Sequence, residues 1–391
     1  MSPPRRRLGV VGVLVLLALG PAAAGAEAAD TTPRLGSHTM IQPSMDPGMV
    51  DTLFAASHDA GLGTVRLDVL AAWLFPTGPD APDWSSLDVV RAAARRHRMQ
   101  VLGLLSAVPL WNARCPPLAE PVHRCPPADD ALWARIVTQI AARAPEIRYW
   151  EILNEANLVN PGTGRGEYFF GDAVEYARLL RVTSAALKRG NPKAKVVFTG
   201  VVEPYRGWLA QVLAQPGTVR AFDVANAHLR GGIGKLDDMV RAARRAFRAG
   251  GFRGPLWVTE TGYPSDQWYQ WDHHYTGINP PTAQHEQARY LHAAVRTLLQ
   301  SGARRVFLTL RDLDGPWGIF ESEGLLNWPV PTRKQSYYTV KGMAQGMVRR
   351  ARRAAARARG PRGSGRARAR RRPARGPRRG SARSSSSPAS R

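Results

Sequence analysis

The stretch Tyr149–Asn157 reads YWEILNEAN, a short apolar run that ends directly in the polar pair Asn154 and Glu155. A second stretch, Trp257–Gly262, reads WVTETG and places Glu260 at the end of another apolar run. Glutamates that close two buried strands are typical of an α/β fold, because the carboxyl ends of parallel strands carry its functional groups. The two glutamates are 105 positions apart, which leaves room for further strands and helices.

Short apolar runs alternate with amphipathic segments eight times between residues 34 and 348. The runs predict strands at Leu35–Met40, Thr64–Asp68, Gln100–Ala107, Ile147–Leu153, Lys195–Gly200, Ala221–His228, Pro255–Glu260 and Arg305–Leu310. Apolar spacings of three and four predict helices that include Leu87–Arg98, Asp129–Arg143, Ala173–Lys188, Leu236–Arg248 and Gln284–Gln300. Eight units of about 39 residues favour a (β/α)8 TIM barrel with insertions, since a doubly wound sheet has fewer strands and a glycine-rich first turn.

A barrel of this kind has its functional side chains at the C-terminal ends of the strands or just beyond them. Polar residues stand at five of the predicted strand ends: Arg66 and Asp68, Asn154 and Glu155, His228, Glu260, and Arg311 with Asp312. Glu155 and Glu260 follow the fourth and seventh strands, so we expect them to face one another across the mouth of the barrel. Paired carboxylates in that position indicate acid and base chemistry.

The two glutamate stretches resemble strands four and seven of the clan A glycoside hydrolases, and families 5 and 39 look nearest. The resemblance extends over most of residues 34–348. It implies a retaining glycosidase in which Glu155 is the general acid/base and Glu260 the nucleophile. It also implies that Asn154 contacts the sugar hydroxyl next to the anomeric carbon, and that Arg66 holds the nucleophile in its ionised form.

The sequence departs from the pattern of this clan at three positions. His228-Leu229-Arg230 stands where members commonly have His-x-Tyr, whose Tyr orients the nucleophile. Strand eight lacks the usual Trp of the sugar site, and Ala156 replaces the usual Pro after Asn-Glu. None of these changes removes a reacting group, but they bear on turnover rate and substrate preference.

Retaining hydrolysis requires a carboxylate that attacks the anomeric carbon and a carboxylic acid that protonates the leaving oxygen, about 5 to 5.5 Å apart. Opposite walls of one barrel mouth allow that separation. The charge of Glu260 should disfavour ionisation of Glu155 and so keep it protonated. The positive charge of Arg66 should favour the ionised form of Glu260.

Other residues near the mouth have both a structural and a functional interpretation. Glu151 shares the strand face of Glu155 but lies about 13 Å deeper along the strand, which favours an interior ion pair over catalysis. His228 is either a packed, hydrogen-bonded histidine or a substrate ligand. Aromatic residues in the predicted loops either pack there or bind sugar rings, and the sugar-binding candidates are Trp111, Trp268 and Trp317.

Two motifs that could indicate other chemistry fail on inspection. In Asp272-His273-His274 the adjacent histidines point apart, and no third ligand has suitable spacing for a metal ion. The glycine-rich segment before Leu236 lacks the Ser or Thr that a phosphate-binding loop needs after its lysine. The sequence therefore predicts neither a metal ion nor a cofactor.

The net charge of +25 comes mainly from the two ends of the chain. Residues 1–26 combine three arginines with an apolar run and small residues, which predicts an export signal. Residues 349–391 contain 17 arginines and no acidic residue, which predicts a disordered basic tail. The remaining 35 basic and 30 acidic residues are nearly balanced, as in an ordinary globular domain over residues 27–348, so a specific nucleic-acid partner is not expected.

Export also favours a disulfide between Cys115 and Cys125, because an oxidising compartment allows two nearby thiols to form one. The segment Arg114–Pro127 contains five prolines and no periodic apolar pattern. We therefore predict a surface loop closed by a disulfide. The alternative is two free thiols.

The sequence favours a secreted retaining glycosidase with a carbohydrate substrate and leaves two alternatives open. A barrel that binds carbohydrate without cleaving it is one, motivated by the missing Tyr at position 230. The other is a cell-surface protein that binds polyanions, since residues 349–391 could hold the chain on an anionic wall polymer or membrane surface.

Overall fold

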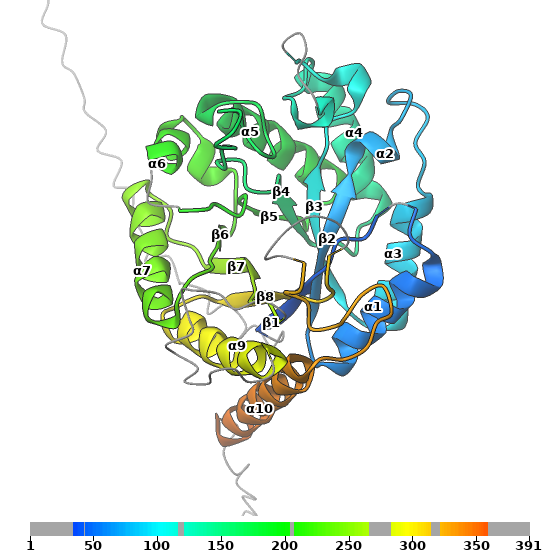
Figure 1. The fold of residues 1–391 in the computed structure, drawn as a ribbon. Helices are drawn as coiled ribbons and strands as arrows, with labels where there is room; N and C mark the ends of the chain where they lie inside the picture. The colour runs from blue at the N-terminus through cyan, green and yellow to red at the C-terminus, as the bar shows by residue number, and fades with distance from the viewer. Residues whose placement is uncertain are drawn as a thin grey trace, which may run out of the picture. The chain divides into compact units, whose positions relative to one another are not determined.

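The computed structural model describes residues 34–42, 44–115, 121–203, 207–265, 283–313 and 321–358. Eight parallel strands form one sheet in the order β5-β4-β3-β2-β1-β8-β7-β6. The strands are β1 Leu35–His38, β2 Thr64–Leu70, β3 Gln100–Ser106, β4 Tyr149–Ile152, β5 Lys195–Val197, β6 Ala225–His228, β7 Leu256–Thr261 and β8 Arg305–Thr309. Figure 1 shows these strands at the centre with the helices around them, which is a (β/α)8 TIM barrel.

The helices are α1 Pro47–Asp59, α2 Ala71–Leu74, α3 Ser85–Arg96, α4 Asp130–Arg143, α5 Ala173–Gly190, α6 Gly207–Ala214, α7 Ile233–Ala249, α9 Ala283–Gln300 and α10 Gln335–Ala358. Short 3-10 turns, η1 to η3, span Leu110–Asn112, Val122–Arg124 and Thr218–Arg220. Aspartates fix three of the helix starts by accepting from free backbone N–H groups: Asp46 before α1, Asp129 before α4 and Asp172 before α5. Within the described ranges, none of the helices has the length and apolarity needed to cross a membrane.

The barrel closes between β5 and β6 through isolated bridges rather than a continuous ladder. Val197 pairs with Val224, and Val201 pairs with Ala227. The backbone N–H of His228 donates to the carbonyl of Val201 at 3.0 Å. The end of β6 is therefore fixed against the segment after β5, and this contact places His228 at the mouth.

An apolar layer fills the barrel below its mouth. Its buried residues are Leu102, Val197, Val224, Trp257 and Phe307. Trp257 lies three residues before Glu260 on β7, so this layer packs beneath the polar side chains at the strand ends. A close-packed apolar layer of this kind limits the movement of the charged groups above it.

The sequence predicted the strands and the helices α3, α4, α5, α7 and α9 to within a few residues at their ends. The chain divides at Arg349, where the sequence placed the boundary, but α10 continues to Ala358, where disorder was expected. Ala and Arg are strong helix formers, and residues 347–359 contain neither Gly nor Pro. The export signal at 1–26 and the remainder of the tail, 359–391, lie outside the described residues.

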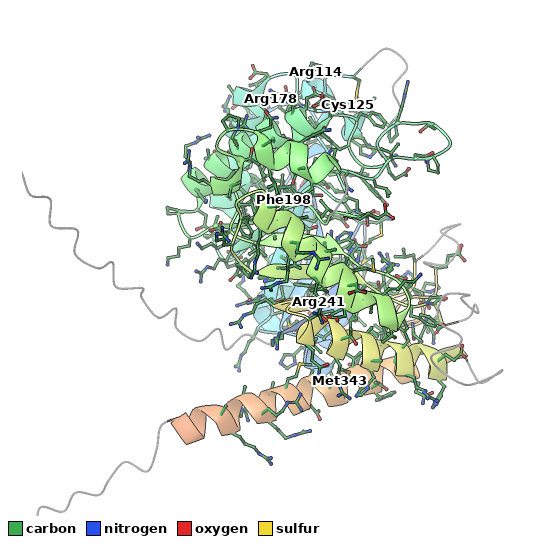
Figure 2. All side chains as sticks on the ribbon, turned by 90° about the vertical axis from the view of Figure 1, so that its left-hand side faces the viewer. Arg114, Cys125, Arg178, Phe198, Arg241 and Met343 are labelled. Atoms are coloured by element: carbon green, nitrogen blue, oxygen red, sulfur yellow. A yellow bond between two sulfur atoms is a disulfide. The ribbon has the colours of Figure 1, made fainter. Side chains whose placement is uncertain are left out.

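The predicted disulfide between Cys115 and Cys125 is confirmed, with the two Cα atoms 5.4 Å apart. Arg114 and Cys125 lie near each other at the top of Figure 2. The backbone N–H of Arg114 donates to the carbonyl of Pro126 at 2.8 Å, so the two sides of the loop are also paired beside the bond. Cys125 is fully buried, which anchors this end of the loop in the core.

Candidate active site

Glu155 lies three residues beyond the end of β4, on an unusual turn. Leu153 and Glu155 have positive φ angles of 61° and 38°, which side-chain-bearing residues rarely adopt. The backbone N–H of Ala156 donates to the hydroxyl of Thr199 at 3.1 Å and holds the turn. Backbone strain of this kind gathers at functional sites, where surrounding contacts maintain it.

Glu260 lies on β7, one residue before the strand ends. The register of β7 shifts against β6 after Ala227 and against β8 after Val258, so the strand is irregular where it carries this side chain. Irregular pairing of this kind often redirects a side chain next to an active site. One carboxylate oxygen of Glu155, one of Glu260 and a ring nitrogen of His228 all lie within 4.8 Å of one another.

Arg66, on β2, connects the buried carboxylates below the mouth. Its Nε and one terminal nitrogen donate to the two oxygens of Glu151, each at 2.8 Å. The other terminal nitrogen donates to Oε1 of Glu260 at 2.7 Å. The guanidinium also donates to Oδ1 of Asn154 at 2.8 Å. Arg66 thus fixes three residues of the candidate site at once.

Glu151 is an interior ion-pair partner, as its depth on β4 predicted. Both Glu151 and Arg66 are fully buried, and their forked contact satisfies both carboxylate oxygens. Burial opposes ionisation of Glu151, but the charges and hydrogen bonds of Arg66 and His228 together outweigh it and lower the pKa of this carboxyl.

His228 is buried and contacts the carboxyl of Glu155 directly. Its Nδ1 lies 2.6 Å from Oε1 of Glu155, and its Nε2 lies 3.0 Å from the hydroxyl of Thr259. A Cβ on Gly200 would lie 1.9 Å from Nε2, so only glycine leaves room for the ring. Burial alone would lower the pKa of His228, but the charge of Glu260 and contacts with two other glutamates raise it to about 9. His228 is therefore an imidazolium at neutral pH.

Glu260 is held from both sides. Arg66 contacts Oε1, and the terminal nitrogen of Arg230 lies 3.3 Å from Oε2. Arg230 is in turn paired with Glu323, at 3.1 Å between Nε and Oε1. Burial opposes ionisation of Glu260, but the positive charges of His228, Arg66 and Arg230 outweigh it and hold its pKa well below the usual range.

The candidate site has three members that the sequence did not assign: His38, Arg230 and Glu323. Nδ1 of His38, at the end of β1, lies 3.7 Å from Oε1 of Glu260 and has no hydrogen-bond partner among the described residues. Burial lowers the pKa of His38 to about 3, so its ring is neutral. Burial and then the charge of Glu155 raise the pKa of Tyr168, whose ring contacts the guanidinium of Arg124.

Asp68 lies on β2, two residues before the strand ends. Burial raises its pKa to about 6; Arg66 opposes this shift and the charge of Glu260 adds to it. The carboxyl therefore changes its charge within a pH range where most surface aspartates stay ionised.

Of the three tryptophans predicted to bind sugar, only Trp111 lies within the described residues. Trp111, on η1, donates its indole N–H to the carbonyl of Phe75 at 2.8 Å and packs against the hydrophobic core. These contacts explain its position without a sugar, so its binding role stays a prediction. Trp268 and Trp317, like Asp272-His273-His274, lie outside the described residues.

Glu155, His228 and Glu260 are close enough together to consider as metal ligands. However, Nδ1 of His228 is already hydrogen-bonded to Glu155, and each oxygen of Glu260 contacts a guanidinium. A cation placed here would be repelled by Arg66, Arg230 and the imidazolium. These three residues therefore do not fit a metal ion.

The sequence matches no protein-family model and no curated protein. Solved structures are similar in fold. A family 39 glycoside hydrolase from Bacteroides cellulosilyticus WH2 has a TM-score of 0.58 and 18% identity over 80% of this chain and 64% of its own. An exo-β-1,4-mannosidase from Opitutaceae bacterium strain TAV5 has a TM-score of 0.56 and 18% identity over 82% and 60%.

A third solved structure is a family 30 subfamily 8 xylanase from Clostridium acetobutylicum, with a TM-score of 0.52 and 13% identity over 80% of this chain and 71% of its own. The chain spans less than two thirds of the length of the first two structures. At these identities the likeness shows the fold, a (β/α)8 barrel that this chain shares with clan A glycoside hydrolases.

Proposed function

We propose that this chain is a retaining glycoside hydrolase that cleaves O-glycosidic bonds by double displacement. The observation that carries the proposal is the pair of carboxylates, Glu155 and Glu260, with oxygens within 4.8 Å of each other at the barrel mouth. Retaining glycosidases hold this pair about 5 to 5.5 Å apart, whereas inverting ones leave about 6.5 to 9.5 Å for a water molecule. The glycosidases among the structures of similar fold support the same class.

In the first step Glu260 attacks the anomeric carbon. Its low pKa keeps it ionised, and contacts at both oxygens hold it in place. A C–O bond forms between the sugar and Glu260 while the glycosidic C–O bond breaks. Asn154, whose amide oxygen is taken by Arg66, retains its amide nitrogen to donate to a sugar hydroxyl. Glu155 gives its proton to the leaving oxygen.

The proton for this step belongs to the pair of Glu155 and His228. Nδ1 of His228 and Oε1 of Glu155 are 2.6 Å apart, so one proton can pass between them without any movement of the backbone. The fully buried ring keeps this exchange away from bulk water. In the second step water attacks the sugar, and the same pair takes up the proton that the water loses.

An activity screen tests the function. We expect the purified protein to hydrolyse at least one aryl glycoside, with β-mannosides and β-xylosides placed first because two of the similar structures act on such sugars. The product, followed by proton NMR from the first turnovers, should keep the anomeric configuration of the substrate. Inverted product would reject double displacement. Carbohydrate binding with no turnover would favour the alternative of a non-catalytic barrel.

We also propose that the protein is exported and held on an anionic wall polymer or membrane surface by residues 349–391. The charged and apolar pattern of residues 1–26 supports export. The disulfide supports it too, because such bonds persist mainly in oxidising compartments. The last turns of α10 expose four arginines: Arg349, Arg350, Arg352 and Arg353.

Truncation after residue 348 tests the anchoring role. The full-length protein should sediment with vesicles that contain anionic lipid and dissociate as salt is raised toward about 0.5 M, because contacts between exposed charges are screened. The truncated protein should not sediment, yet it should keep its glycosidase activity since the site lies within residues 38–323. Equal sedimentation of both proteins would contradict the proposal.

A further inference from the structure

We infer that Arg230 is a positioning residue for Glu260. We also infer that Glu323 holds Arg230 in place and offsets part of the effect of its positive charge on Glu260. This inference deepens the proposed function, on which it rests for the role of Glu260 as nucleophile. The sequence showed only that Arg230 occupies a position where an orienting Tyr was expected. The contacts of Arg230 with Glu260 and Glu323 assign the orienting role to Arg230 itself.

The two guanidinium groups contact different oxygens of Glu260. Arg66 reaches Oε1 from β2, at 2.7 Å, and Arg230 reaches Oε2 from the segment after β6, at 3.3 Å. A carboxylate held by one donor can still rotate about its last side-chain bond. One that is held at both oxygens, from β2 and from the segment after β6, keeps a single orientation.

Glu323 restrains Arg230 from the opposite side. Its oxygens accept from Nε and from a terminal nitrogen of Arg230, each at 3.1 Å. Glu323 is 2% exposed, and a Cβ on Gly262 would lie 2.5 Å from its Oε2, so glycine beside Glu260 makes room for it. An arginine fixed by such a forked contact loses little freedom when it also binds Glu260.

The two partners of Arg230 repel each other. Burial raises the pKa of Glu323; Arg230 lowers it and Glu260 adds to the increase. By the same interaction, the charge of Glu323 opposes ionisation of Glu260. Arg230 therefore stabilises the ionised Glu260, and Glu323 offsets part of that effect.

The charge of Glu260 depends on groups from every element around it. Besides Arg230 and Glu323, the titratable or charged groups that face or influence it are His38, Arg66, Asp68, Glu151, Glu155, Tyr168 and His228. A test must therefore alter Arg230 and Glu323 while these groups stay unchanged.

A direct test is a carboxyl ¹³C NMR titration of Glu260 in the full-length protein, with the signal assigned by its loss in Glu260→Gln. In Arg230→Met we expect the pKa of Glu260 to rise by about 1 unit or more, since a neighbouring opposite charge is lost. In Arg230→Met/Glu323→Gln the rise should be smaller, because the repelling carboxylate is also gone. Arg230→Lys keeps the charge, so the pKa should stay close to that of the wild type.

Arg241→Met is the matched control, because Arg241 is an exposed arginine on α7 paired with Asp237 four residues away (Figure 2). It should leave the pKa of Glu260 unchanged. The acid limb of kcat/KM should move to higher pH in Arg230→Met and stay in place in the control. A merely structural role would lower activity at every pH without moving this limb.

Two outcomes would overturn the inference. A folded Arg230→Met protein with an unchanged Glu260 pKa would remove the role of Arg230. An equal rise in the single and double variants would remove that of Glu323. If Arg230→Met does not fold, the double variant carries the test, since it leaves no unpaired buried carboxylate. The titration does not need turnover, so an inactive wild type with the expected shifts would reject the proposed function and keep the inference.

Discussion

Glu260→Ala is expected to lose turnover on every glycoside, by about 10⁴-fold or more. The nucleophile takes part in both displacements, so a good leaving group cannot compensate for its loss. The measurement is kcat/KM on the best substrate of the screen and on a dinitrophenyl glycoside of the same sugar. Both values should fall together.

The variant should still fold, because it removes a carboxylate whose partners keep other contacts. Arg66 retains Glu151, and Arg230 retains Glu323. Glu146→Ala is a suitable control, since Glu146 pairs with Arg91, from α3, at 2.6 Å and takes no part in the site contacts. Wild-type activity in a folded Glu260→Ala protein would require the role of Glu260 to be withdrawn.

The fold could be predicted from the sequence because its signals are local. Each strand is a short apolar run, and each long helix has apolar residues at spacings of three and four. Both signals can be read without knowledge of distant contacts. The positions of Arg66, Asn154, Glu155, His228 and Glu260 followed from one further rule, that functional groups lie at strand ends. Helix α1 was not predicted, although Asp46 and Pro47 form a recognisable helix start.

The site residues that could not be predicted from the sequence are defined by contacts between distant segments. Glu323 lies in the loop after β8, 93 residues from its partner Arg230, and nothing in its neighbouring residues marks it. His38 ends a predicted strand, but its sequence context does not show that Nδ1 would lie near Glu260. Arg230 was visible only as a departure from a pattern. It contacts Glu260 from a segment that follows a register shift between β6 and β7, which a strand pattern does not encode.

The structure also changes the electrostatic argument. From the sequence, Arg66 was the one cation expected to keep Glu260 ionised. The structure adds Arg230 and an imidazolium at His228, while His38 stays neutral. A more crowded positive environment favours a nucleophile that stays ionised in acid, and it places the proton donor under the influence of His228 rather than of Glu260 alone.

Glu155→Ala should separate the two chemical steps. Loss of the acid should reduce the hydrolysis of glycosides with poor leaving groups by about 10²- to 10⁴-fold, which is typical when general acid and base help is removed. A dinitrophenyl glycoside needs no protonation to leave, so Glu260 should still form the glycosyl-enzyme from it. The intermediate should then accumulate, and its mass should be detectable on the intact protein.

Added azide should restore turnover in this variant, because a small anion can enter the space that Glu155 vacates and attack without a base. The product should be a glycosyl azide with the configuration of the substrate, since two displacements at one carbon restore the stereochemistry. His228→Ala in the wild-type background is the companion variant: it removes the 2.6 Å contact but keeps the carboxyl, so it should lose less activity and gain nothing from azide. An azide product of inverted configuration in Glu155→Ala would mean that no glycosyl-enzyme lies on the pathway, and the assigned roles of both glutamates would fall together.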